Sequence, residues 1–68
     1  MEERTAQELA DLIAGGISLG VGEKIQVNSD PLYGWHPTVF ASPQRTWSLQ
    51  LAAEGSAARL RTKYKLKA

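Results

Sequence analysis

The chain has 68 residues, 43% of them hydrophobic, with a formal net charge of +1 and no cysteine. A chain this short forms one domain that buries only about 60% of its unfolded surface, which argues against an enzyme with a deep, enclosed active site. Without cysteine, neither a disulfide nor a thiolate metal site can hold the fold together. We therefore predict a single small domain over residues 1–68, with no metal and no cofactor, that associates with a second copy or a protein partner.

Charge is divided unevenly along the chain. Residues 1–34 hold two cations and six anions, whereas residues 35–68 hold six cations and one anion. Such a division indicates a basic C-terminal face for an anionic partner, or self-association between acidic and basic faces. No apolar run reaches the roughly 18 residues of a membrane span. Glu2 and Glu3 precede the first cation, which is the wrong charge for a secretory signal, so we predict a cytoplasmic protein that has no membrane segment.

The first predicted element is an amphipathic helix over residues 5–14. Thr5 and Glu8 have the spacing of a capping box, and Leu9 and Ile13 continue an apolar stripe at helical spacing. Gly15 and Gly16 then predict a left-handed helix cap.

A glycine-rich stretch follows over residues 15–22. It matches neither the phosphate-binding loop nor the dinucleotide fingerprint. We interpret it as a turn in which Ile17, Leu19 and Val21 pack on the core.

Two strands are predicted next. Residues 23–29 alternate between apolar and polar side chains, and Asp30-Pro31 with Gly34 marks a turn. Residues 35–42 resume an extended pattern. Pro37 indicates that this second strand lies at a sheet edge, because proline cannot donate a hydrogen bond to a neighbouring strand.

A third strand is predicted over residues 46–53, after a tight turn at residues 42–45. Trp47, Leu49 and Leu51 alternate with polar residues, and the turn places Trp47 opposite Phe40 on the inner face.

From Ala58 to Lys67, apolar or weakly polar residues alternate with cations, which favours a fourth strand. Helix-forming residues at 57–61, with Ser56 as a cap, leave a C-terminal helix as the alternative. The predicted fold class is α+β: an N-terminal amphipathic helix packed on an antiparallel meander of three to four strands. The alternative order is αβββα.

The basic residues of the C-terminal half are the first candidate site. On a strand, alternate cations would project from one face at intervals of about 6.8 Å. That interval is close to the phosphate spacing of about 6–7 Å along a nucleic-acid strand. The alternative is that these cations form a solvated sheet face that binds no ligand. The candidate nucleic-acid or anion-binding residues are Arg45, Arg59, Arg61, Lys63, Lys65 and Lys67.

Aromatic residues near the proline-rich turn are the second candidate site. Tyr33 and Trp35 are candidates for a partner interface, and the alternative is that they belong to the core. His36 is the only histidine, and no nucleophile motif or metal-ligand spacing accompanies it. The sequence therefore predicts a non-enzymatic, self-associating interaction module with a basic C-terminal face. Nucleic-acid binding through the cationic row is the alternative function.

Overall fold

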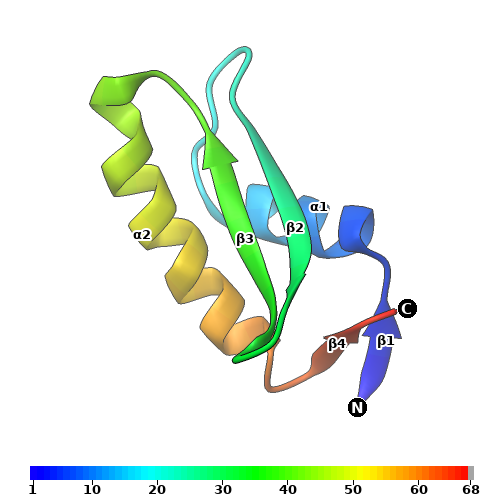
Figure 1. Ribbon diagram of the computed structural model, residues 1–68. Helices are drawn as coiled ribbons and strands as arrows, with labels where there is room; N and C mark the ends of the chain where they lie inside the picture. The colour runs from blue at the N-terminus through cyan, green and yellow to red at the C-terminus, as the bar shows by residue number, and fades with distance from the viewer. Residues whose placement is uncertain (68) are drawn as a thin grey trace.

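A computed structural model describes residues 1–67 and confirms the α+β class. Two helices cover one face of an antiparallel hairpin, and a short parallel strand pair lies near both chain termini (Figure 1). Only the hairpin is antiparallel, so the meander of three to four strands is wrong in strand number. In chain order the elements are β1 (Glu2–Arg4), α1 (Ala6–Gly16), β2 (Lys24–Asp30), β3 (Gly34–Phe40), α2 (Pro43–Leu60) and β4 (Tyr64–Leu66).

Helix α1 begins where the capping box predicts. The Thr5 hydroxyl accepts from the Glu8 amide at 3.1 Å, and the Glu8 carboxylate accepts from the Thr5 amide at 2.9 Å. The predicted left-handed cap is wrong, because the helix runs through Gly15 and Gly16 and ends on extended Ile17. Gly16 instead allows a close approach between the helices: a Cβ added there would lie 3.4 Å from the Ser56 hydroxyl of α2.

In the segment between α1 and β2, Ile17 and Leu19 pack against the core, as predicted. Val21 is fully exposed, so its predicted core contact is wrong.

The hairpin of β2 and β3 forms as predicted. Lys24 pairs with Phe40 at its open end and Asp30 pairs with Gly34 at the turn. The Asp30 carboxylate accepts from the amides of Leu32 and Tyr33, at 2.8 and 2.9 Å. Gly34 leaves the turn with a φ of 88°, a conformation that glycine adopts without strain. The turn therefore follows from Asp30 and Gly34, the residues that predicted it.

The predicted strand over residues 46–53 is wrong, because these residues lie inside helix α2. Pro43 occupies the first turn of that helix, where its missing amide is no cost. Leu49, Ala53 and Ala57 then recur at intervals of four and form the buried stripe. The alternation at Trp47, Leu49 and Leu51 is thus the chance overlap of a helical face with a period of two.

The predicted strand over residues 58–67 is correct only at its end. Helix α2 continues to Leu60, and a turn at residues 61–63 leads into the three-residue strand β4. The alternative, a helix over residues 57–67, is likewise right only as far as Leu60. Strand β4 pairs in parallel with β1, so that Glu2 lies opposite Tyr64. The sequence pattern did not predict β1.

The core lies between the hairpin and the helices. Trp35, Leu9, Ile13 and Pro37 are its largest fully buried residues. The predicted inner-face pair of Phe40 and Trp47 is wrong, because these side chains are 43% and 74% exposed. Residues 46–53 form part of helix α2 and not a strand, and Trp47 therefore points away from the sheet. The buried hydrophobic residues are Leu9, Ala10, Ile13, Val27, Trp35, Val39, Leu49, Ala53 and Ala57.

Helix α2 also covers the outer edge of β3. The Gln50 side chain accepts from the Val39 amide and donates to the Pro37 carbonyl, both at 2.9 Å. One amide side chain thus makes the donor and acceptor contacts that a neighbouring strand would make. Farther along this edge, Arg61 donates from Nε to the Trp35 carbonyl at 2.9 Å. Pro37 therefore lies on an edge strand, as predicted, and that edge is occupied by side chains of the C-terminal half.

Candidate functional site

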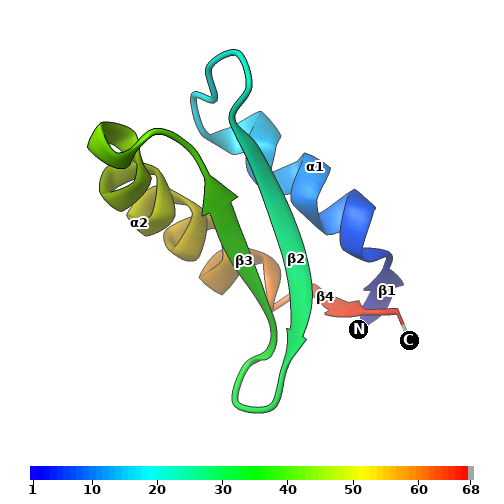
Figure 2. The ribbon, with the colours of Figure 1, turned by 45° about the horizontal axis from the view of Figure 1, so that its top comes forward.

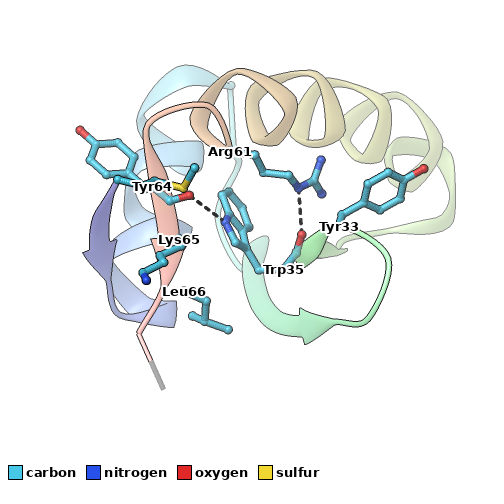
Figure 3. A pocket seen from close by; sticks show the side chains of 8 residues that line it. Tyr33, Trp35, Arg61, Tyr64, Lys65 and Leu66 are labelled. Carbon is cyan, nitrogen blue, oxygen red and sulfur yellow. Dashed lines mark hydrogen bonds between the residues drawn. The ribbon is translucent and has the colours of Figure 1, made fainter.

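The two candidate sets of the sequence meet at the C-terminal end of α2. Arg61 caps that helix, and its guanidinium lies 4.9 Å from the ring centre of Tyr33 and 5.2 Å from that of Trp35 (Figure 3). Both distances are within the range of cation–π attraction. The hydrogen bond from Nε to the Trp35 carbonyl fixes the plane of the guanidinium. Arg61 is thus held in place by contacts within the chain.

A pocket of about 270 Å³ opens beside this arginine. This volume is just below the roughly 300 Å³ at which small-molecule sites begin, so the pocket suits one side chain rather than a large cofactor. The Trp35 indole Nε1 donates to the Tyr64 carbonyl at 3.3 Å and so joins β4 to β3 across the pocket. The lining residues are Met1, Tyr33, Gly34, Trp35, Arg61, Tyr64, Lys65 and Leu66.

Trp35 has a structural role as well as a place in the pocket wall. It is 1% exposed, which confirms the alternative that assigned it to the core. Tyr33 is 56% exposed and covers the outer side of the Arg61 guanidinium. Of the two proposed interface residues, only Tyr33 therefore offers substantial surface to a partner.

Charge near the pocket is basic, with an acidic group at its edge. Lys65 lines the pocket, and its Nζ lies 3.7 Å from the Glu3 carboxylate. The pKa of Asp30 is lowered, first by the amides of Tyr33 and Leu32 and to a smaller extent by the nearby Arg61 guanidinium. Asp30 is thus an ionised carboxylate committed to the hairpin turn.

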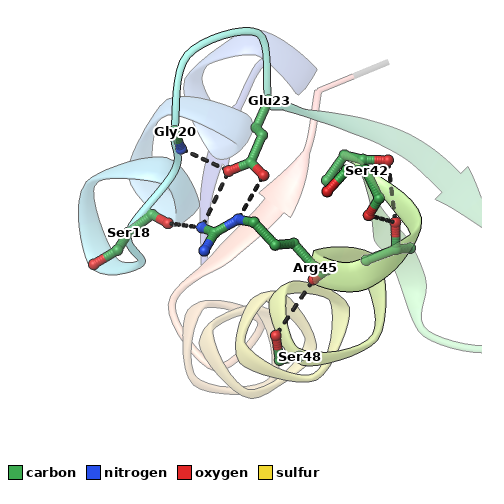
Figure 4. A network of polar contacts seen from close by, with 8 residues as sticks. Ser18, Gly20, Glu23, Ser42, Arg45 and Ser48 are labelled. Atoms are coloured by element: carbon green, nitrogen blue, oxygen red, sulfur yellow. Dashed lines mark hydrogen bonds and ion pairs between the residues drawn. The ribbon is translucent and has the colours of Figure 1, made fainter.

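Arg45 does not belong to this pocket. It donates from Nε to the Glu23 carboxylate at 2.6 Å and from Nη2 to the Ser18 carbonyl at 2.9 Å (Figure 4). Its hydrogen bond is the largest cause of the lowered pKa of Glu23, and the Gly20 amide adds to it. Arg45 therefore ties the start of α2 to the loop before β2, which is a structural role.

The other candidate cations do not form the predicted row. Arg59 is exposed on α2, Lys63 lies in the following turn, and Lys67 follows β4. A helix, a turn and a short strand present these side chains in different directions, so the regular 6.8 Å spacing along one strand face is wrong. The candidates that the structure brings together are Tyr33, Trp35, Arg61 and Lys65.

His36 lies apart from the Arg61 pocket. Its Nε2 is 3.8 Å from the Glu54 carboxylate, and its Nδ1 is buried without a hydrogen-bond partner. Among residues 1–67, no three His, Cys, Asp or Glu side chains gather closely enough to hold a metal ion. Within the same residues, neither helix combines the length and apolar character that crossing a membrane requires.

Sequence reasoning missed two features: the contact of Gln50 with the edge of β3, and the residues of β4 that line the Arg61 pocket. Gln50 gave no signal because a lone glutamine in an apparent strand looks like a solvent-facing residue. Comparison with known proteins adds no assignment, since no family model, curated protein or solved structure matches the chain.

Proposed function

We propose that this chain is a non-enzymatic interaction module that binds a carboxylate-bearing segment of a partner protein in the Arg61 pocket. The observation that carries the proposal is the placement of the Arg61 guanidinium between Tyr33 and Trp35. Its Nε is used by the Trp35 carbonyl, whereas Nη1 and Nη2 have no hydrogen-bond partner among residues 1–67. Two parallel N–H donors on a fixed plane match the two oxygens of a carboxylate.

The pocket walls favour a peptide over a nucleic acid. Leu66, Trp35 and Tyr64 give the pocket apolar surface, which suits an aliphatic side chain next to the carboxylate. Nucleic-acid binding needs several cations that follow the backbone. Here Arg45 is engaged by Glu23 and Lys65 lies close to Glu3, and the remaining cations come from separate elements. Nucleic acid is therefore the alternative that the experiment must exclude.

The test is a fluorescence titration of the pocket tryptophan. A Trp47→Phe background leaves Trp35 as the reporter, because Trp47 is exposed on the far side of α2. The probe is a short blocked peptide with glutamate between two leucines, and its glutamine analogue is the ligand control. We expect saturable binding of the glutamate peptide that Arg61→Gln weakens by about tenfold or more.

Arg59→Gln is the matched protein control, since it removes the same charge two residues away from an exposed position. It should leave the affinity unchanged. Equal binding of the glutamate and glutamine peptides, or no saturable change at millimolar peptide, overturns the proposal. The nucleic-acid alternative would be established instead by two results together. An oligothymidylate would bind more tightly than the glutamate peptide, and Arg59→Gln and Arg61→Gln would weaken that binding equally.

Self-association is a second candidate, favoured by the outer face of α2. Trp47 and Leu51 lie one turn apart on that face and are 74% and 51% exposed. Such a pair loses water-exposed apolar area if two copies pack through it. Light scattering should show a species above 7.4 kDa that Leu51→Glu dissociates. The control is Leu32→Glu, because Leu32 is 77% exposed in the hairpin turn. A wild-type particle of 7.4 kDa at high micromolar concentration contradicts this candidate.

Cytoplasmic location stays a prediction from composition.

A further inference from the structure

The two edges of the β2–β3 hairpin are treated differently by the fold. The β3 edge is occupied by Gln50 and Arg61, as described above. No side chain or backbone group among residues 1–67 forms a hydrogen bond with the outer edge of β2. Natural proteins usually cover, bulge or charge an open edge, because it can pair with another strand. The fold covers the β3 edge of this two-stranded sheet and leaves the β2 edge open, so β2 is the strand that can pair with another chain.

The register identifies which groups of β2 face outward. The Val39 amide and the carbonyls of Trp35 and Pro37 point toward α2, away from β2. In an antiparallel pair, residues opposite such positions also point their backbone groups away from the partner strand. Those residues are Ile25, Val27 and Ser29. Each therefore presents one amide donor and one carbonyl acceptor at the outer edge.

A groove runs along this edge. It has a volume of about 400 Å³ and lies between α1 and β2, where α1 is placed beside the strand (Figure 2). Ala6 and Ala10 form part of its α1 wall, and their small side chains leave room for the inward side chains of an added strand. The lining residues are Ala6, Gln7, Ala10, Ile25, Gln26, Val27 and Asn28.

We propose that an extended segment of a partner protein pairs antiparallel with β2 and lies in this groove. Its residues opposite Ile25, Val27 and Ser29 point toward the α1 wall and are apolar, because side chains opposite each other share a sheet face. Lys24 and Asp30, at the two ends of β2, select an acidic and a basic residue opposite them. This surface is separate from the Arg61 pocket, and it does not rest on the function proposed there.

The position of α1 argues for a single strand over a second copy of the chain. The N-terminal end of α1 extends past β2 behind its open edge (Figure 1). A copy related by a two-fold axis at this edge would bring its own α1 into the same space. An isolated strand carries no such helix, so it fits the groove.

The experiment measures amide hydrogen exchange by NMR with and without a blocked peptide. The probe has the sequence lysine, valine, threonine, valine, threonine, valine, glutamate, with the lysine opposite Asp30. In the free chain, the amides of Ile25, Val27 and Ser29 should exchange faster than those of Gln26 and Asn28, which face β3. At saturating peptide, we expect the three outward amides to slow by about tenfold or more. The two inward amides should not change.

Two controls separate strand pairing from other modes of binding. N-methylation of the valines at the second and fourth positions of the peptide would remove two donors that face β2 and should weaken binding about tenfold or more, whereas N-methylation of both threonines should not. Ala6→Trp should fill the groove and abolish binding, whereas Ala52→Trp, on an exposed part of α2, should leave it intact.

Equal affinity of the two methylated peptides overturns the proposal. So does a free chain that sediments as a dimer with its outward β2 amides already protected, since a second copy then occupies the edge. Arg61→Gln should leave this peptide's affinity unchanged. Failure here therefore does not bear on the Arg61 pocket, and failure of the pocket does not bear on this edge.

Discussion

Replacing Gln50 with leucine should destabilise the domain, because it removes the hydrogen bonds that join α2 to the edge of β3. Gln50 makes two 2.9 Å hydrogen bonds to β3, and their net worth is about 1 kcal/mol each. Val39 is only 5% exposed, so water has poor access to the amide that Gln50→Leu leaves without a partner. The expected loss is about 2 kcal/mol, a large part of the roughly 5 kcal/mol that a small domain has. The melting temperature should fall by about 10 °C.

Urea unfolding followed by circular dichroism measures this loss. Gln44→Leu is the matched control, because Gln44 is exposed on the same helix and its side chain makes no hydrogen bond within residues 1–67. Leucine and glutamine have similar helix propensities, so the control should stay within about 0.5 kcal/mol of the wild type. If Gln50→Leu is no less stable than Gln44→Leu, Gln50 does not hold α2 to the β3 edge.

Three further changes test the packing, the helix start and the ion pair. Trp35→Ala should cost about 3–5 kcal/mol, whereas Trp47→Ala should cost less than about 0.5 kcal/mol, and equal thermal shifts would contradict the assigned core. Thr5→Ala should cost about 1 kcal/mol in urea unfolding, and no loss would exclude the capping box. The pKa of Glu23 is lowered by Arg45, so its stabilising effect is complete above its unfolded pKa and is lost as pH falls through the folded value. Urea midpoints at pH 7 and pH 3 should therefore differ less for Glu23→Gln than for the wild type, and equal differences would contradict this contribution.

Local signals were enough to predict the start of α1 and the β2–β3 hairpin. The capping box at Thr5 and Glu8 fixed the start of α1, and the alternation in β2 with Asp30 and Gly34 in the turn fixed the hairpin. Each of these signals depends on contacts between residues that are close in sequence. Such contacts need no knowledge of distant elements, so the pattern and the structure agree.

Residues 46–53 were mispredicted as a strand because their alternating apolar side chains come from two different faces of helix α2. Leu49 belongs to the buried stripe of α2, whereas Trp47 and Leu51 lie on the opposite face and happen to flank it at a spacing of two. The buried stripe is completed by Ala53 and Ala57, whose small side chains give a weak hydrophobic signal. Helix propensity over this alanine-rich segment outweighed the strand pattern.

For the Arg61 pocket, the sequence predicted several of the residues but not their arrangement in space. Tyr33 and Arg61 were selected for different reasons, as an interface aromatic and as one of a row of cations. Their stacking depends on where α2 ends and on the turn of the hairpin, which are contacts between residues distant in sequence. The parallel pairing of β1 with β4 is likewise non-local, and three-residue strands carry no periodicity from which to predict it.

The most direct test of the central claim is an NMR titration that resolves side-chain N–H signals. Addition of the leucine–glutamate–leucine peptide should shift the Arg61 Nε–H signal and the Trp35 indole N–H signal together, because both groups line the Arg61 pocket. The Arg59 Nε–H signal should not move. Shifts at Arg59 equal to those at Arg61, or no shift at Arg61 and Trp35 at millimolar peptide, would contradict carboxylate binding in this pocket.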